Sequence, residues 1–257
     1  MAFALPPSSP PAALVTGGAR RIGCAIVLAL ARAGYAVAIH ANRSLKAAEE
    51  LCRTIARDGG RAGVVAADLA EHDHVLRLVP AAIAAVGPLT LLVNNASEFE
   101  PDEIGDLDRD RFDRHFAINL RAPLFLTQLF AAQAPAGGSV VNILDQRVYR
   151  PTPRFFSYGL AKSGLYVATT TLAQALAPKL RVNAVAPGPT LPNARQDGET
   201  FARRSAAMPL GHGPTPEEIA GAVLFLARAN NITGETIAVD GGQHIIWQGF
   251  PDAGDED

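Results

Sequence analysis

Short runs of apolar residues alternate along the chain with longer segments in which apolar residues recur at every third or fourth position. Several short runs are apolar at consecutive positions, which is typical of parallel strands covered on both faces. The longer segments, such as residues 21–33 and 46–58, predict amphipathic helices. We expect strands at residues 12–16, 35–40, 62–66, 89–93, 139–144, 181–186 and 236–239. This alternation predicts an α/β fold, a doubly wound parallel sheet with helices on both faces.

The pattern runs on without a linker or an internal repeat, so we expect a single domain over residues 12–250. The clearest helix start is Thr215-Pro216-Glu217-Glu218, which combines an N-cap, a proline at the first helical position and a capping-box glutamate. Residues 188–213 are the least regular stretch. Because long loops in compact domains are usually functional, they predict a substrate lid, with an irregular surface segment as the alternative.

Composition and charge narrow the possible partners. Apolar residues make up 48% of the chain, enough for a large core, and a formal net charge of −2 argues against nucleic acid or an anionic membrane surface. No apolar run approaches the roughly 18 residues that a membrane span needs. Cys24 and Cys52 lie in predicted helices and match no metal spacing, which indicates a reducing compartment.

The two ends of the chain differ from the rest. Residues 1–11 are rich in proline and serine, which predicts a flexible N-terminus without the features of a signal peptide. Residues 251–257 predict a frayed acidic tail. With the reduced cysteines, these observations favour a cytoplasmic protein.

The first predicted strand runs into a glycine-rich turn that opens the first helix, at residues 16–23. Glycines let backbone N–H groups approach a pyrophosphate, and the helix N-terminus adds partial positive charge. A strand before the turn and a helix after it form the context that a dinucleotide motif requires, although an ordinary βα turn is the alternative. We therefore expect a Rossmann-like domain that binds a dinucleotide through Gly17, Arg20, Arg21 and Ile22.

The residues after the second predicted strand indicate which dinucleotide binds. Folds that select NAD usually place an acid there for the ribose hydroxyls, but residues 40–44 contain none. Arg43 would pair with a 2′-phosphate and Ser44 would donate a hydrogen bond to it. The sequence therefore predicts NADPH, bound by Asn42, Arg43 and Ser44 with Arg20 or Arg21 nearby. A solvated arginine at a helix start is the alternative.

Tyr158 and Lys162 are spaced i, i+4 on a predicted helix, which puts both side chains on one face. An ammonium group beside a phenol favours the phenolate and lowers the pKa of the tyrosine towards neutrality. Such a tyrosine can donate a proton to a substrate as hydride arrives. Lys162 can also hold the nicotinamide ribose. Alone, such a pair is more often a surface pair, and it gains meaning from the other motifs.

Taken in order, these motifs resemble the short-chain dehydrogenase/reductase family over nearly the whole chain, from about residue 12 to Gly242. The resemblance implies that Asn119 holds a water linking Lys162 to a proton supply. It also implies further contacts with the cofactor, made by Asp68 and Leu69 at the adenine, by Asn95 and Ala96 after the fourth strand, by Tyr158 and Lys162, and by Pro187, Gly188 and Thr190 at the nicotinamide.

One departure from the family pattern is informative. Most members carry a serine about thirteen positions before the catalytic tyrosine, where this chain has Asp145. A carboxylate could accept hydrogen bonds from a substrate rich in N–H groups, or hold a proton when desolvated. Pteridine reductases, a subgroup, are similar at this position. They also resemble this chain at Arg21, at Arg43-Ser44 and at residues 95–99.

The resemblance implies a pterin-type substrate, and the residue types suit one. Phe99 offers a flat face on which a planar heterocycle could stack, and Asp145 offers an acceptor for ring N–H groups. Arg21 and Ser97 could bind the ring or a phosphate. Hydride would pass from NADPH to the dihydropteridine ring, with Tyr158, or a proton passed through Asp145, supplying the nitrogen proton. Phe99 as simple packing and Asp145 as a partner of Arg147 are the alternatives.

Two other functions stay open. One is a ketone or 3-oxoacyl-thioester reductase of the same family, and the other is a non-catalytic NADP(H)-sensing protein. The second is disfavoured because such proteins typically lose the tyrosine or the lysine. His72-Asp73-His74 has no third ligand in sight, so we expect a helix cap there and no metal site. Trp247, just past the last strand, is compatible with a homo-oligomer, and the family resemblance implies a tetramer.

Overall fold

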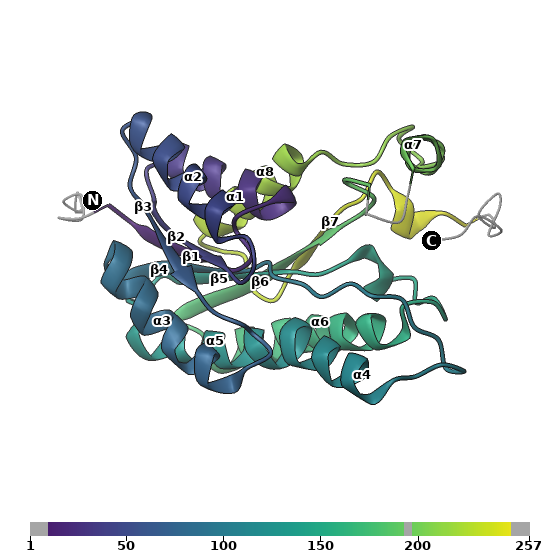
Figure 1. Cartoon of the computed structure of the whole chain (residues 1–257), viewed down its shortest axis with the longest axis horizontal. Helices are drawn as coiled ribbons and strands as arrows, with labels where there is room; N and C mark the ends of the chain where they lie inside the picture. Colours follow the sequence, from purple (N-terminus) through teal and green to yellow (C-terminus); the bar gives the residue numbers. More distant parts are fainter. Residues whose placement is uncertain (1–9, 193–196, 248–257) are drawn as a thin grey trace.

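The computed structural model describes residues 10–192 and 197–247, which share one seven-stranded parallel sheet (Figure 1). The strand order is β3-β2-β1-β4-β5-β6-β7. The predicted doubly wound α/β fold is confirmed, and each predicted strand lies within one residue of its expected ends. The strands are β1 (Ala12–Val15), β2 (Ala36–Ala41), β3 (Ala62–Ala66), β4 (Leu89–Asn94), β5 (Gly138–Ile143), β6 (Leu180–Pro187) and β7 (Thr236–Val239).

Helices cover both faces of this sheet (Figure 1). One face carries α1 (Arg21–Arg32), α2 (Leu45–Arg57) and α8 (Pro216–Arg228), and the other carries α3 (His72–Val86), α4 (Arg109–Phe116), α5 (Ala122–Gln133) and α6 (Phe156–Leu176). A π-helical turn, η1 (Ala117–Arg121), joins α4 to α5, and the single turns η2 (Gln146–Val148) and η3 (Gln243–Ile245) follow β5 and β7. The remaining helix, α7 (Gly198–Ala206), lies beyond the carboxyl end of β7.

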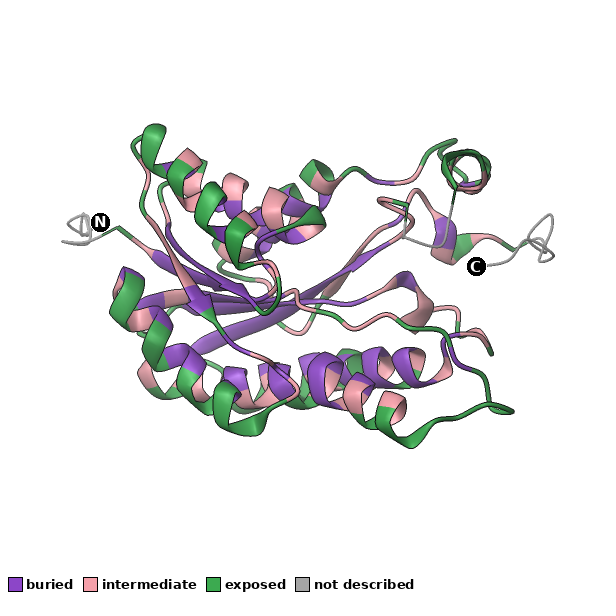
Figure 2. Cartoon of the chain, in the orientation of Figure 1, coloured by how far each residue is buried: buried purple, intermediate pink, exposed green. Residues whose placement is uncertain are grey.

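The strands are apolar at consecutive positions because both of their faces are buried. In β1, Ala13 and Val15 pack with α1 and α8, whereas Ala12 and Leu14 pack with α3 and α5. Figure 2 shows the same contrast for the whole molecule, with a buried sheet between helices whose outer faces are exposed. Two cores therefore hold the sheet rigid between them, and burial of apolar area supplies the main stabilisation.

The order of the strands determines where a ligand can bind. The chain runs from β1 outward to β3 and then returns to β4 on the other side of β1. At this switch point the loops after β1 and β4 diverge and leave a crevice beyond the carboxyl ends of the strands. The predicted phosphate turn and the residues that follow β4 and β5 all lie at this edge.

The segment predicted to be an irregular lid is more regular than expected. Its described part contains α7, where Asp197 caps the helix by accepting a hydrogen bond from the Thr200 amide at 2.7 Å. The sequence missed α7 because none of its residues is fully buried, so no apolar period marks it. Whether residues 188–213 close as a lid stays a prediction, and residues 193–196 lie outside the described part.

Predictions for the start of α8, the two cysteines and the two ends of the chain can be compared with the structure. The capping box at Thr215 and Glu218 is present at the start of α8, and Cys24 and Cys52 are free thiols in α1 and α2. The expected N-terminal segment 1–11 and the tail 251–257 fall almost wholly outside the described residues. Within residues 10–192 and 197–247, no helix combines the length and apolar character needed to cross a bilayer. In the same part of the chain, no group of three metal-ligating side chains is found.

Candidate active site

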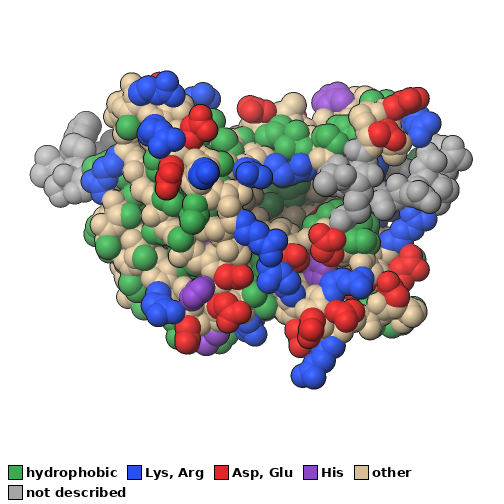
Figure 3. Space-filling view, viewed as in Figure 1, with side chains coloured by type: hydrophobic (Ala, Val, Ile, Leu, Met, Phe, Trp, Pro, Cys, Tyr) green, Lys and Arg blue, Asp and Glu red, His purple; other side chains and the backbone are tan. Residues whose placement is uncertain are grey.

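A cleft of about 730 Å³ opens at the carboxyl ends of the strands. Figure 3 shows it as a hollow between the two halves of the molecule, with Lys and Arg side chains along its upper edge. Every residue predicted to bind the cofactor or the substrate lines this cleft, and Asn119 alone among the predicted site residues does not. The cofactor set is Gly17, Arg20, Arg21, Ile22, Asn42, Arg43, Ser44, Asp68, Leu69, Asn95, Ala96, Tyr158, Lys162, Pro187, Gly188 and Thr190, and the substrate set is Arg21, Ser97, Phe99, Asp145 and Tyr158.

The glycine turn after β1 is held in a tight conformation. Gly17 has φ +61°, which favours glycine, and a Cβ on Gly23 would lie 2.2 Å from the Gly17 carbonyl oxygen. The Asn95 side-chain amide donates to the carbonyls of Thr16 at 2.8 Å and Gly17 at 3.1 Å. The Thr16 hydroxyl in turn accepts from the Asn95 and Ala96 amides. The turn is thus tied to the end of β4, which places it at the head of the cleft.

His40, near the end of β2, contacts the glycine turn. No motif in the sequence indicated this role. The His40 Nδ1 accepts a hydrogen bond from the Gly17 amide at 3.0 Å, so the ring proton is assigned to Nε2, which donates to the Ala67 carbonyl at 3.1 Å. Burial lowers the pKa of His40 to about 4, and the hydrogen bond to Ala67 opposes that shift. The neutral ring therefore fixes the glycine turn, β2 and the end of β3 together.

The residues expected at a 2′-phosphate and adenine lie at one end of the cleft. Asn42, Arg43 and Ser44 follow β2, and Asp68 follows β3. Partial burial acts to raise the pKa of Asp68, but hydrogen bonds from the Ala70 amide and the Asn42 side chain, with the charges of Arg114 and Arg43, lower it overall. Asp68 is therefore an anion that neighbouring donors hold in place, and Arg43 remains the cation next to the predicted ribose position.

Tyr158 and Asp145 meet directly in the cleft. The Tyr158 hydroxyl donates to Asp145 Oδ2 at 2.9 Å, and Asp145 Oδ1 accepts from the Arg147 amide at 2.8 Å. The Arg147 guanidinium also pairs with Asp145 Oδ2 at 3.3 Å. The alternative expected for Asp145, a pair with Arg147, is therefore present, and its role towards a substrate stays a prediction. Lys162, one helical turn after Tyr158, donates to the Ile143 carbonyl at 2.7 Å.

The expectation that Lys162 makes Tyr158 acidic is wrong for this structure. The Lys162 Nζ lies 5.8 Å from the centre of the Tyr158 ring. Burial, and then the negative charge of Asp145, raise the pKa of Tyr158 well above its usual value, and the opposing effects of Arg147 and Ser97 are smaller. Burial also lowers the pKa of Lys162 to about 8. The phenol is thus held in its protonated form, which is the form a proton donor needs.

Phe99 and Phe155 form the aromatic wall of the cleft. Their rings stack with centres 4.3 Å apart and planes 5° apart, and the edge of Phe99 meets Tyr158 at 4.8 Å. The Arg147 guanidinium carbon lies 5.5 Å from the Phe99 centre and 5.1 Å from the Phe155 centre. One face of Phe99 is therefore used in packing, as the alternative interpretation expected, although the residue also lines the cleft. Tyr149, which follows η2, packs against Tyr166 and His244 and does not line the cleft.

Asp102 fastens the loop that carries Phe99 to the helix that carries Tyr158. It is 2% exposed, and its carboxylate accepts hydrogen bonds from both the amide, at 3.0 Å, and the hydroxyl of Ser157. Its own carbonyl accepts from the Phe156 amide at 3.1 Å. Phe155 precedes α6 with φ +56° and offers no side-chain cap, so Asp102 satisfies the first donors of α6. In the sequence, Asp102 is one of several acidic residues in a loop, so no motif predicts this role.

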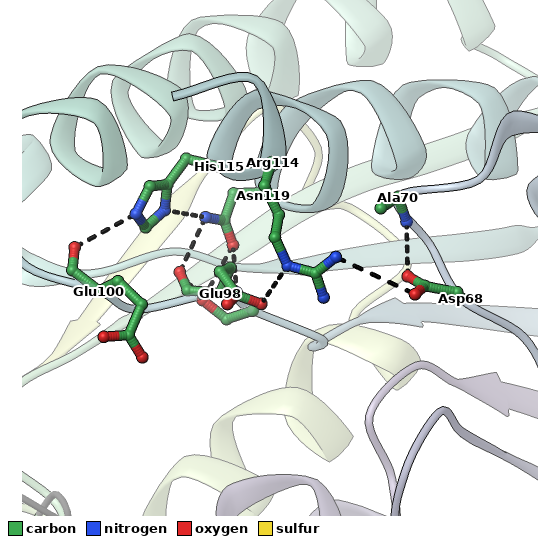
Figure 4. A network of polar contacts seen from close by, with 8 residues as sticks. Asp68, Ala70, Glu98, Glu100, Arg114, His115 and Asn119 are labelled. Carbon is green, nitrogen blue, oxygen red and sulfur yellow. Dashed lines mark hydrogen bonds and ion pairs between the residues drawn. The ribbon is translucent and has the colours of Figure 1, made fainter. Parts of the chain in front are cut away.

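Asn119 lies behind the cleft rather than in it, on the π-helical turn η1 (Figure 4). Its Oδ1 accepts from the Ser97 hydroxyl at 2.9 Å and the Glu98 amide at 3.1 Å, and its Nδ2 donates to the Glu98 carbonyl at 2.9 Å. The side chain thus holds the loop after β4 that carries Ser97 and Glu98. Because both Oδ1 lone pairs are used, a water relay at this position would depend on the Asn119 backbone carbonyl.

Arg114 links the two sides of the cleft in the same network. Its Nε lies 3.3 Å from the Glu98 carboxylate and its Nη1 lies 4.0 Å from Asp68 (Figure 4). The guanidinium of Arg114 therefore connects the loop after β4, which carries Glu98, to the loop after β3, which carries Asp68.

The fold and the cleft define a class, the dinucleotide-dependent oxidoreductases. A model of the enoyl-(acyl carrier protein) reductase family matches residues 17–244. An uncharacterized oxidoreductase of Methylorubrum extorquens is 35% identical over 238 residues, which cover 90% of this chain and 96% of the relative. The chain belongs to the short-chain dehydrogenase/reductase family of oxidoreductases.

Two solved structures are similar over nearly the whole chain. An alternative dihydrofolate reductase 1, FolM, from Brucella canis in complex with NADP is 51% identical, with a TM-score of 0.91, and the match covers 95% of this chain and 97% of that one. A blue fluorescent protein from a metagenomic library in complex with NADPH is 36% identical, with a TM-score of 0.86, over 90% of this chain and 97% of that one. The predicted resemblance to pteridine reductases agrees with the first of these.

Proposed function

We propose that this protein is an NADPH-dependent reductase of pterin-type substrates, dihydropteridines and dihydrofolate among them. The observation that carries the proposal is the contact between the Tyr158 hydroxyl and Asp145 at 2.9 Å, with Phe99 against the same tyrosine. An acceptor carboxylate beside a proton donor suits a ring rich in N–H groups better than a simple ketone. The 51% identity to a dihydrofolate reductase crystallised with NADP supports the same substrate class.

The glycine turn and the hydrogen-bond donors that line the cleft suit NADPH. Gly17 and Gly23 keep the turn free of side chains, and the α1 N-terminus behind it suits a pyrophosphate. Arg43 and Ser44 would hold the 2′-phosphate, Asp68 and Leu69 the adenine, and Asn95, Ala96, Pro187, Gly188 and Thr190 the remainder. When bound, NADPH supplies the hydride. Lys162 would position the nicotinamide ribose.

The protein's own groups supply the proton and the orientation. Tyr158 keeps its proton because burial raises its pKa, so it can donate to a ring nitrogen as that nitrogen becomes basic. Asp145, kept in place by Arg147, would accept hydrogen bonds from the ring's N–H and amino groups. Phe99 would limit the ring to one plane. Asn119 positions Ser97 and Glu98, and Lys162 would return the proton to Tyr158.

The substrate assignment is tested by NADPH oxidation with 7,8-dihydrobiopterin, dihydrofolate, a small aromatic ketone and a 3-oxoacyl thioester. We expect turnover of one or both dihydropterins, with kcat/KM at least about a hundredfold above that of the carbonyl compounds, because only the pterins use Asp145 fully. Efficient turnover of the thioester or the ketone, with none of the pterins, would establish the alternative reductase instead. No turnover of any compound despite tight NADPH binding would favour a sensor.

Cofactor choice gives a second test, on Arg43. Arg43→Ala is expected to weaken NADPH binding about 10- to 150-fold, as lost hydrogen bonds to a charged group cost about 1.5–3 kcal/mol, and to leave NADH binding nearly unchanged. Dissociation constants from fluorescence titration with both cofactors measure this. Arg57→Ala, on the exposed end of α2 outside the cleft, is the matched control. Equal losses for the two cofactors would remove Arg43 from the phosphate site.

A cytoplasmic location and a homotetramer complete the proposal. The free thiols of Cys24 and Cys52 suit a reducing compartment. Ile245 and Trp247 are 65% and 87% exposed at the end of the described chain, which suits contact with a second copy.

A further inference from the structure

Helix α7 forms the wall of the cleft at the end away from α2 (Figure 1). Two of its side chains, Phe201 and Arg204, line the cleft. They are three residues apart, so they lie side by side on one face of the helix. Because Arg43 and Ser44 precede α2, Arg204 is at the opposite end from the predicted 2′-phosphate site. An aromatic ring and a guanidinium thus both line the cleft at this end.

Arg203 and Arg204 are adjacent on α7, but only Arg204 lines the cleft. Arg203 is exposed, does not line the cleft, and donates to the Thr200 hydroxyl at 3.4 Å on the outer side of α7. Arg204, next to it, is only partly exposed and faces inward. The chain therefore carries two adjacent arginines on one helix, of which one belongs to the cleft.

The C-terminal end of α7 is firmly attached, so its inner face has a defined position. The Ser205 hydroxyl accepts a hydrogen bond from the Gly213 amide at 2.7 Å, and Met208 is 3% exposed. The Leu210 amide donates to the Gly241 carbonyl at 3.0 Å, which ties this segment to the end of β7. Such anchoring reduces the entropy lost when a ligand binds.

Two of the carboxylates that line the cleft have arginine partners. Asp145 is paired with Arg147 at 3.3 Å and Glu98 with Arg114 at 3.3 Å, so these two carboxylates are largely compensated. Arg204, a third arginine, also lines the cleft. A carboxylate that reaches α7 would meet a cation there that recognises it by a charge-assisted hydrogen bond.

We propose that Phe201 and Arg204 form an outer subsite that binds the aryl and carboxylate-bearing substituent of a conjugated dihydropterin, so that the enzyme prefers conjugated substrates such as dihydrofolate to unconjugated ones. This inference rests on the proposed function and adds the chemical class of substrate. The pterin ring would lie beside Tyr158 and Asp145, and the substituent would extend along α7. Phe201 would pack against the aryl group, and Arg204 would pair with a carboxylate.

The test compares Arg204→Met with wild type on two substrates. For dihydrofolate, we expect KM to rise about tenfold or more with kcat within about twofold, because only substrate binding loses a charged contact. For 7,8-dihydrobiopterin, which has no carboxylate, KM should stay within about twofold. The dissociation constant for NADPH should also stay within about twofold. Arg203→Met is the matched control and should leave all of these values unchanged.

Several results would overturn the subsite. These are equal increases in KM for both substrates, equal effects of Arg203→Met and Arg204→Met, or a weakened NADPH complex, which would assign Arg204 to the cofactor. Titration of the wild-type NADP⁺ complex with folate and with biopterin separates the subsite from the reaction. Folate that binds at least tenfold more tightly, with the gain lost in Arg204→Met, supports the subsite even if the wild type turns over neither dihydropterin. Equal affinities would refute it.

Discussion

Tyr158→Phe is expected to lower kcat for dihydropterin reduction about 1,000-fold, because positioned general acids contribute roughly 10²- to 10⁴-fold. The variant keeps the ring that packs against Phe99 and loses only the hydroxyl that donates to Asp145 at 2.9 Å. Binding of NADPH should stay within about twofold of wild type. Steady-state assays and a fluorescence titration of NADPH measure the two quantities.

Tyr149→Phe is the matched control for this substitution. The Tyr149 hydroxyl donates to the Thr236 carbonyl at 3.2 Å, and the residue does not line the cleft. Its loss should leave kcat unchanged within about twofold. If Tyr158→Phe retained wild-type turnover, the assigned proton donor would be incorrect, and Asp145 would become the candidate for delivering the proton.

Asp102→Ala is expected to lower the free energy of unfolding by about 3–5 kcal/mol, since it leaves the buried amide and hydroxyl of Ser157 without their acceptor. Urea unfolding at pH 7 measures this loss. At low denaturant the folded variant should also show a raised KM for the pterin, because the loop with Phe99 is no longer fastened to the helix with Tyr158.

Asp108→Ala provides the comparison for Asp102→Ala. Asp108 is an exposed cap of α4 that accepts from the Arg111 amide at 2.9 Å, and its loss should cost only about 0.5–2 kcal/mol with no change in KM. Ser157→Ala removes one donor of the same contact, so its effect should not add to that of Asp102→Ala. An Asp102→Ala variant as stable and as active as wild type would show that the contact has no positioning role.

The fold could be predicted closely because its signals are local and repeated. The five inner strands are buried on both faces and the edge strands β3 and β7 are partly buried, so each appears in the sequence as a short apolar run, and all seven were found within one residue. Helix α7 was not found because it is short and none of its residues is fully buried. A periodic apolar signal exists only where a helix packs one face against a core.

The residues that line the candidate site could be predicted from the sequence, but their contacts and pKa values could be predicted only in part. Motif positions brought the cofactor and substrate residues to one cleft, because loops after parallel strands meet at one edge of the sheet. The roles of His40 and Asp102 depend on contacts with residues 23 and 55 positions away in the chain, which no motif spacing encodes, whereas the pairing of Asp145 with Arg147, two positions away, was expected. The expected acidification of Tyr158 failed because burial, and then the charge of Asp145, raise the pKa of Tyr158.

By itself, the sequence determined the alternation of strands and helices, the glycine turn without an acid after β2, and the replacement of the usual serine by Asp145. These are properties of residue type and spacing, which the chain carries before it folds. Only the tertiary structure decided which groups are desolvated, which carboxylates are paired, and which of two adjacent arginines on α7 faces the cleft. Solvation and charge pairing depend on distances between distant segments, and packing alone sets those distances.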